Sequence, residues 1–236
     1  MKIALAQLNY HIGNFSSNTS KIIAAIEKAK AQQAEIIVFS ELAIGGYPAK
    51  DLLQNAAFLN NCHNSLTVIA SHCQDILCII GAPIPNTDSE GKALYNAAVC
   101  LENGKIIHVS KKGLLPDYDV FDEYRYFEPN RQFTCLTYKN TKIALTICED
   151  LWDDDQGNNS YVGDPMQELL QENPDLLINI AASPFSYSHY QDRLAVLRSQ
   201  VAKAQRPLIY VNQVGAHMDI IFDGRSLAMD ENGAIC

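Results

Sequence analysis

Residues 141–152 read TKIALTICEDLW, and the rest of the chain is organised around this stretch. Its first part is an apolar run interrupted only by Thr146, which is typical of a buried strand. The run stops at Cys148, Glu149 and Asp150, so a thiol stands where the chain must turn. Because nearby negative charge raises the pKa of a thiol, a nucleophilic Cys148 would need a cation and a base from elsewhere in the chain.

The chain contains seven cysteines, and most free cysteines are small residues of the core. They form no CxxC pair and no zinc-ligand spacing, and the six histidines form no HxxxH pair. We therefore expect reduced thiols, as in the cytoplasm, and no metal site. Taken alone, each cysteine is better explained by packing than by catalysis.

Composition favours one large globular domain. The 236 residues are 47% hydrophobic and 19% charged, which fits an undivided α/β domain rather than a disordered chain. The net charge is -9 and no basic run exceeds Lys111-Lys112, which argues against nucleic acid or an anionic membrane as the main partner. No apolar run is long enough to span a bilayer and the start lacks a signal-peptide core, so we expect a cytoplasmic protein.

Hairpin patterns and strand–helix–strand patterns alternate along the chain. Strands are predicted at 2–9, 35–41, 75–83, 93–101, 105–111, 175–183, 207–215 and 225–230, a hairpin at 133–147, and helices at about 17–33, 52–73, 166–173 and 189–204. This order predicts a mixed sheet covered by helices, an α/β architecture of two or more layers. Residues 113–130 form a long irregular segment that is rich in aromatic and acidic residues, and such loops are usually functional.

Three of the predicted strands end in residues with useful chemistry: Glu41, Lys112 and Cys148. Each has an ordinary explanation alone, as a solvated acid, an exposed lysine and a core thiol. Together they supply the base, the cation and the sulfur that a thiol nucleophile requires.

Around these three residues, the sequence resembles the nitrilase, or carbon–nitrogen hydrolase, superfamily. The matching motifs are FSELAIGGYP around Glu41, KKGLLP around Lys112 and TICEDLW around Cys148, in the same order and across essentially the whole chain. Within the superfamily, the chain is most similar to the glutaminase domain of glutamine-dependent NAD synthetase. That likeness rests on QLNYHIGNFSSN, LPDYDVFDEYRYF, ICEDLW and the SPF at 183–185.

The resemblance implies a single-domain α-β-β-α sandwich that pairs into homo-oligomers. It also implies that Cys148 attacks the side-chain carboxamide of glutamine, with Glu41 as the general base. Lys112 and the backbone N–H of Glu149 would stabilise the oxyanion, and Glu123 would help to hold the lysine. A thioester would form, and water would then release glutamate.

The resemblance assigns the substrate contacts less completely. Tyr118, Glu149 and Ser183 would hold the α-amino and α-carboxylate groups of glutamine. A basic residue is expected a few positions after SPF, and the candidates are His189 and Arg193. A histidine there would make glutamine binding depend on pH near neutrality.

The ATP-pyrophosphate loop of a synthetase, typically SGGxDS, does not occur in these 236 residues. We therefore expect the chain to be the ammonia-producing part of a longer protein, cut short within its own last elements. Its ammonia would amidate nicotinic acid adenine dinucleotide in a synthetase domain, and no cofactor is expected here because ATP and Mg would belong to that domain. Two alternatives remain open: a free-standing amidase for another small amide, and an inactive oligomerisation scaffold.

Overall fold

The strands pair mainly into two five-stranded sheets. The structure is a computed structural model that describes residues 1–88, 90–152 and 163–236. The first sheet has the order β1 (Ile3–Leu5), β2 (Ile36–Val38), β3 (Leu77–Pro85), β4 (Leu94–Glu102) and β5 (Lys105–Lys111). The second has the order β12 (Leu227–Met229), β9 (Leu208–Asn212), β8 (Leu176–Ala181), β7 (Thr141–Ile147) and β6 (Leu136–Tyr138). Parallel pairs occur in both, at β1–β2–β3 and at β7–β8–β9.

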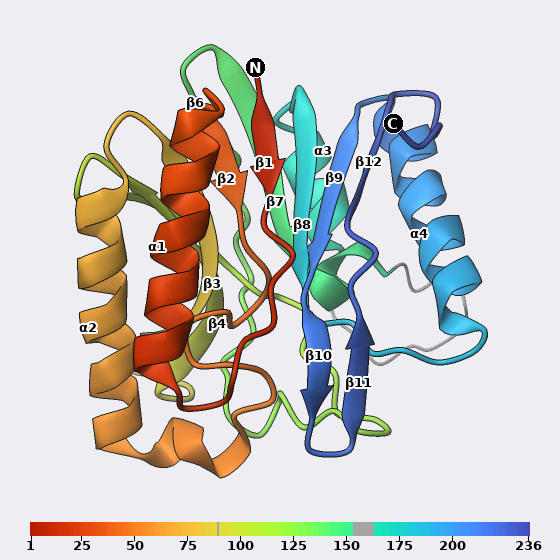
Figure 1. The fold of residues 1–236 in the computed structure, drawn as a ribbon. Coiled ribbons are helices and arrows are strands. Elements are labelled where there is room, and N and C mark those ends of the chain that lie inside the picture. The colour runs from red at the N-terminus through yellow and green to blue at the C-terminus, as the bar shows by residue number, and fades with distance from the viewer. Residues whose placement is uncertain (89, 153–162) are drawn as a thin grey trace.

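Helices cover the outer face of each sheet, which gives four layers (Figure 1). Helices α1 (Phe15–Ala31) and α2 (Ala56–His72) lie on the first sheet, and α3 (Pro165–Leu170) and α4 (His189–Ala204) lie on the second. The α-β-β-α sandwich implied by the resemblance is therefore confirmed. No helix in the described ranges is both long and apolar enough to cross a membrane.

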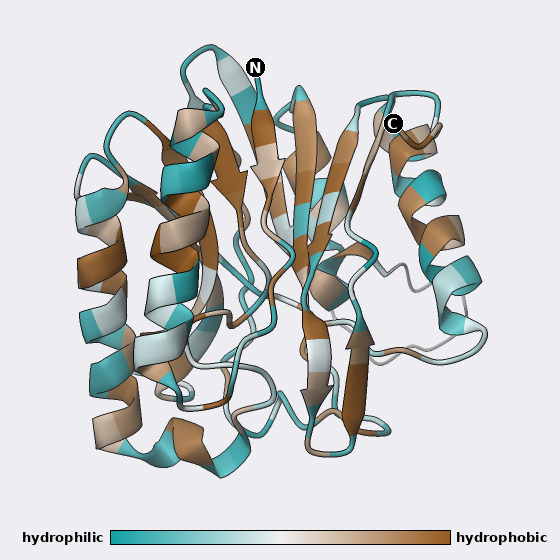
Figure 2. Cartoon of the chain, viewed as in Figure 1, coloured by the Kyte–Doolittle hydropathy of each residue, from teal (hydrophilic) through white to brown (hydrophobic). Residues whose placement is uncertain are grey.

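Alternating side chains of the strands supply two apolar cores. In β2, Ile37 packs into the core under α1 and α2, while Ile36 and Val38 pack into the core shared with the second sheet. This is the period of two expected for a strand that is buried on both faces. Figure 2 shows hydrophobic residues along the central strands and many hydrophilic residues on the helices.

The structure departs from the sequence patterns in three places. The patterns alone predicted one mixed sheet, whereas the described strands form two five-stranded sheets and one two-stranded sheet. The strand expected at 207–215 divides into β9 and β10 (Val214–His217), and β10 pairs with β11 (Ile220–Asp223), which no pattern predicted. The helix expected at 52–73 breaks at Asn55, which has an extended backbone and accepts hydrogen bonds that cap α2, so that the 3₁₀ turn η1 (Lys50–Gln54) precedes it.

Candidate active site

Cys148 opens a 3₁₀ turn, η2 (Cys148–Leu151), directly after the buried strand β7. Its φ of +44° lies in the left-handed region, which is uncommon for a residue with a Cβ. The side-chain amide of Asn179, in the neighbouring strand β8, donates to the Cys148 carbonyl at 3.4 Å. The thiol is therefore presented at a sharp turn at the end of a central strand.

Glu41 lies three residues beyond β2, in a turn that packs closely on β3. A Cβ at Gly81 would lie 2.6 Å from the Glu41 Cα, so only glycine allows this approach. Glu41 is 1% exposed, and its Oε2 accepts from the backbone N–H of Ala182 at 2.9 Å. Because Ala182 follows β8, the carboxylate of Glu41 bridges the two sheets.

Lys112 follows β5 and is fully buried between two carboxylates. Its Nζ lies 2.7 Å from Glu41 Oε1, and 2.9 and 2.8 Å from the two oxygens of Glu123. Asn96, in β4, donates to Glu41 at 2.7 Å and to Glu123 at 3.2 Å, and the Tyr47 hydroxyl donates to Glu123 at 3.0 Å. We call these five residues the Lys112 cluster.

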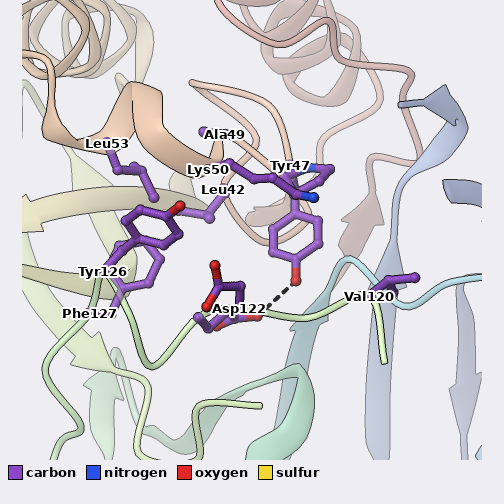
Figure 3. A pocket seen from close by; sticks show the side chains of 11 residues that line it. Leu42, Tyr47, Ala49, Lys50, Leu53, Val120, Asp122, Tyr126 and Phe127 are labelled. Carbon is purple, nitrogen blue, oxygen red and sulfur yellow. Dashed lines mark hydrogen bonds between the residues drawn. The ribbon is translucent and has the colours of Figure 1, made fainter. Parts of the chain in front are cut away.

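A largely apolar pocket covers the far side of Glu123. Figure 3 shows Tyr47 extending towards the chain segment of Asp122, with Tyr126 and Phe127 on the opposite wall. The lining is Leu42, Tyr47, Pro48, Ala49, Lys50, Leu53, Val120, Asp122, Glu123, Tyr126 and Phe127. These side chains help to keep water away from the Lys112 cluster.

Burial sets the protonation states of the site. Burial raises the pKa of Glu123 to about 7, although Lys112 pulls it down. Burial lowers the pKa of Lys112, but Glu123 and Glu41 outweigh it and hold that pKa well above the usual value. Burial and then Glu41 raise the pKa of the Cys148 thiol, against the effect of Lys112. At neutral pH the lysine is charged and the thiol carries its proton, so attack by sulfur requires a base.

A second cluster of charged and polar side chains lies between β8, β11 and the first turns of α4. Arg193 Nη1 lies 3.3 Å from Asp223 Oδ1, and Arg225 Nε lies 3.2 Å from Asp223 Oδ2. Arg193 Nη2 donates to Ser183 Oγ at 3.2 Å, and His189 Nε2 lies 3.1 Å from the same oxygen. We call these five residues the Arg193 cluster. Since two guanidinium groups share one carboxylate, the cluster carries a net positive charge.

The Arg193 cluster borders the nucleophile. Cys148, Ser183 and Arg193 line one small cavity, together with Leu151, Trp152, Asn179, Val196, Leu197 and Tyr210. Three buried polar atoms among these residues, Asn179 Oδ1, Arg193 Nε and the Tyr210 hydroxyl oxygen, have no hydrogen-bond partner in the described structure. Glu149 directly follows Cys148 in the chain, and its Oε1 accepts from the Tyr118 hydroxyl at 2.9 Å.

The predicted site residues form three hydrogen-bonded groups near Cys148. Glu41, Lys112 and Glu123 are in direct contact, and Cys148 is close enough for all three to affect its pKa. Of the predicted substrate residues, Tyr118 contacts Glu149, which follows Cys148 in the chain, and Ser183 contacts His189 and Arg193. Their roles stay predictions. In the described part of the chain, no three histidine, cysteine or acidic side chains are grouped as a metal site requires.

Sequence reasoning missed Asn96 and Tyr47, which hold the two acids of the Lys112 cluster. Asn96 interrupts an otherwise apolar strand, and a buried amide in such a strand must find partners. That interruption was a usable signal. Tyr47 lies in a turn-rich loop, where an aromatic residue gives no comparable signal.

Comparison with known proteins places this site in a family. The family model named carbon-nitrogen hydrolase matches residues 2–236. The chain belongs to the carbon–nitrogen hydrolase family. Among relatives of this carbon–nitrogen hydrolase, the glutamine-dependent NAD(+) synthetase of Synechocystis sp. is 41% identical, over 99% of this chain and 43% of that protein. The protein of that name from Xanthomonas campestris is 34% identical, over 100% of this chain and 41% of its own length.

Solved structures agree with this assignment. Glutamine-dependent NAD+ synthetase from Acinetobacter baumannii, in complex with ADP, matches this carbon–nitrogen hydrolase with a TM-score of 0.86 and 35% identity, over 99% of this chain and 42% of that one. An amidase of the nitrilase superfamily from Nesterenkonia AN1 has a TM-score of 0.83 at 18% identity, over 100% of this chain and 84% of that one, which shows the fold alone. The chain spans less than half the length of the curated relatives described above.

Proposed function

We propose that this chain hydrolyses the side-chain amide of glutamine through a thioester on Cys148. One observation carries the proposal: a fully buried lysine is held between Glu41 and Glu123, beside a thiol whose pKa responds to all three. Burying three charged groups is costly, and such groups concentrate where chemistry uses them. Family membership supports amide hydrolysis, and the names of the relatives support glutamine as the substrate.

In the first half-reaction, Glu41 takes the proton of the Cys148 thiol as sulfur bonds to the carboxamide carbon. The carbonyl oxygen becomes an oxyanion, which the Lys112 ammonium and the Glu149 backbone N–H stabilise. Fixed charge in a site closed to water stabilises such an oxyanion more strongly than it would in solution. Glu41 then returns its proton to nitrogen, the carbon–nitrogen bond breaks, and ammonia leaves behind a thioester.

In the second half-reaction, water attacks the thioester carbon and Glu41 takes a proton from that water. The carbon–sulfur bond breaks, the proton passes to sulfur, and glutamate leaves. Asn96 and Glu123 keep Glu41 and Lys112 in place through both halves, because each contacts one or both of them directly.

The charges on either side of Cys148 complement a free amino acid. Glu149, with Tyr118, offers a carboxylate to the α-ammonium group. The Arg193 cluster offers its net positive charge to the α-carboxylate, with Ser183 as a hydroxyl donor. We assign the charge to Arg193 because a guanidinium stays protonated at all relevant pH. Burial, and then Arg193, lowers the pKa of His189, so His189 contacts the substrate site as a neutral ring at pH 7.

We further propose that the ammonia serves a synthetase domain that binds ATP and Mg and amidates nicotinic acid adenine dinucleotide. Support comes from the NAD(+) synthetase relatives, of which this chain matches less than half. Assembly into homo-oligomers and a cytoplasmic location stay predictions.

The first experiment measures glutamate release from glutamine by the wild-type chain, by Cys148→Ala and by Cys236→Ala. Cys236 is an exposed thiol at the end of the chain, so its removal controls for the loss of any cysteine. We expect release from the wild type and from Cys236→Ala, and none from Cys148→Ala. Asparagine and propionamide, tested in parallel, should be poor substrates because they do not reach both charged ends of the site.

If the wild-type chain releases no glutamate, it is treated with a glutamine-mimicking chloroketone and analysed by mass spectrometry. Labelling at Cys148 alone would show a competent nucleophile in a glutamine-shaped site. Absence of both release and labelling would contradict the proposal. Faster hydrolysis of propionamide than of glutamine would instead favour the free-standing amidase.

A further inference from the structure

The Asp150 carboxylate contacts both segments that carry the proposed reaction. Asp150 lies in η2, two residues after Cys148, and is 3% exposed. Its Oδ1 accepts from the backbone N–H groups of Gly113 and Leu114, each at 2.9 Å, and its Oδ2 accepts from the backbone N–H of Ile147 at 3.1 Å. Gly113 and Leu114 directly follow the buried lysine, and Ile147 directly precedes the thiol.

These contacts join the two sheets. The lysine follows β5 of the first sheet, and the thiol follows β7 of the second. We infer that Asp150 is a positioning residue that fixes Cys148 relative to Lys112. The inference rests on the proposed thioester chemistry, in which that spacing decides how well the oxyanion is stabilised.

The chemistry of the contacts supports a positioning role. All three partners are backbone N–H groups, and charge-assisted hydrogen bonds of this kind are shorter and stronger than neutral ones. Burial raises the pKa of Asp150 to about 7, whereas the N–H of Leu114 and the charge of Lys112 oppose that shift. Burial of an acid is unfavourable, and its presence here is explained by its hydrogen bonds to the two chain segments that it joins. It also closes the turn in which Cys148 has its left-handed backbone.

Asp150→Asn tests the inference with little change of volume. The asparagine oxygen can still accept from Gly113 and Leu114, but its NH₂ group meets the N–H of Ile147, so two donors face each other. The turn of Cys148 should shift while the segment of Lys112 stays in place. We expect kcat for glutamine to fall about 100-fold, because a displacement of about 1 Å has an effect of this size. KM should stay within about threefold, since the Arg193 cluster is untouched.

Asp175→Asn is the matched control. Asp175 is exposed, and its Oδ2 accepts from the backbone N–H of Lys142 at 2.8 Å. Lys142 lies near the start of β7, the strand that leads to Cys148. The same substitution there should leave kcat unchanged. An Asp150→Asn enzyme with kcat within threefold of the wild type overturns the inference, and so does one whose KM rises as much as its kcat falls.

A measurement on the wild type decides the matter if Asp150→Asn does not fold. The amide hydrogens of Gly113, Leu114 and Ile147 should show one common free energy of opening after correction for their intrinsic exchange rates, because one carboxylate holds them. Three different opening free energies overturn the inference. Lack of glutamine hydrolysis in the wild type would count against the proposed function, and the exchange rates would still test the contacts of Asp150.

Discussion

The Lys112 cluster and the Arg193 cluster lie near the same thiol but are built differently. In the first, Glu41 and Lys112 are 1% and 0% exposed and are joined by a 2.7 Å contact. In the second, Arg225 has a side chain that is 45% exposed, and its contact with Asp223, the shorter of the two ion pairs described above, is 3.2 Å. In the first cluster every charged group is buried and paired, and only the amide oxygen of Asn96 lacks a partner in the described structure, while the second is partly open and keeps a buried charged donor, Arg193 Nε, without a partner.

This difference matches the work that each cluster is proposed to do. Proton transfer and oxyanion stabilisation gain from a site of low polarity whose groups do not move, because charges act most strongly where water is excluded. Recognition of an amino acid needs access and a few unsatisfied polar groups that converge on the ligand. The molecule thus has a closed cluster suited to the proposed reaction beside a more open cluster suited to the proposed binding.

The largest effect is expected from Lys112→Met, which removes the cation of the closed cluster. Two buried carboxylates would then lack their partner, and breaking a buried ion pair in this way typically costs about 3–5 kcal/mol of stability. Glutamate release should fall at least about 100-fold, as when a group that stabilises an oxyanion is lost. Urea unfolding and steady-state kinetics measure both effects.

Lys111→Met is the control for that experiment. Lys111 is only partly buried and lies over the Tyr95 ring at 3.8 Å, so its loss should change stability by less than about 1 kcal/mol. Equal effects of the two substitutions would mean that the burial of Lys112 between two carboxylates has no special effect on stability or activity.

Arg193→Met should affect binding rather than chemistry. Loss of a charged hydrogen-bond donor to the substrate costs about 1.5–3 kcal/mol, which is a rise in KM of about 10–100-fold. Asp223 keeps Arg225 as a partner, so the remaining carboxylate is not left alone. Measurement of kcat and KM with glutamine checks this. A fall in kcat at constant KM would place Arg193 in the reaction site instead.

Glu123→Gln should change how stability depends on pH. Because burial raises the pKa of Glu123 from 4.5 to about 7, the folded chain keeps a proton that the unfolded chain releases. The contribution of Glu123 to the free energy of unfolding therefore falls as pH rises from 4.5 to 7. In the variant this fall should be shallower by up to about 1.4 kcal/mol per pH unit.

Urea unfolding at pH 5, 6 and 7 measures the slope, and Glu35→Gln is the control. Glu35 is a partly exposed acid whose pKa is lowered, chiefly by its hydrogen bond to Lys139, so it titrates below this window. An unchanged slope in Glu123→Gln would mean that Glu123 is ionised throughout.

The smallest effect is expected from Arg225→Gln, at the open edge of the Arg193 cluster. Its charge is half-exposed, so salt should screen its attraction for the substrate carboxylate. We expect a rise in KM of a few-fold at low salt that disappears near 1 M salt. Titration of KM against salt concentration measures it. A large rise in KM that persists at high salt would show that solvent ions do not reach this edge of the cluster.

Much of the fold and of the reaction site could be predicted from the sequence. Apolar runs that stop abruptly at Glu41, Lys112 and Cys148 gave their positions in the chain, and the motifs gave their proposed roles. The partners of these groups could not be predicted in the same way. Asn96, Tyr47 and Asp150 act through hydrogen bonds to residues distant in the chain, and such geometry leaves little trace in a linear pattern.

The binding side was harder to predict for a related reason. The Arg193 cluster depends on Asp223 and Arg225, which belong to β11 or follow it directly. No pattern predicted β11, because a four-residue strand in a separate two-stranded ribbon is too short to show an alternation. Without that strand, the sequence could not show that Arg193 is already paired or that the cluster is positive.

One feature of the reaction site reaches beyond catalysis. Glu41 and Lys112 follow strands of one sheet, and Cys148 follows a strand of the other. Neither half of the molecule therefore holds the complete set of groups proposed to react. If the proposed chemistry holds, a chain whose two sheets have not packed together releases no ammonia, and glutamate release then measures correct tertiary packing.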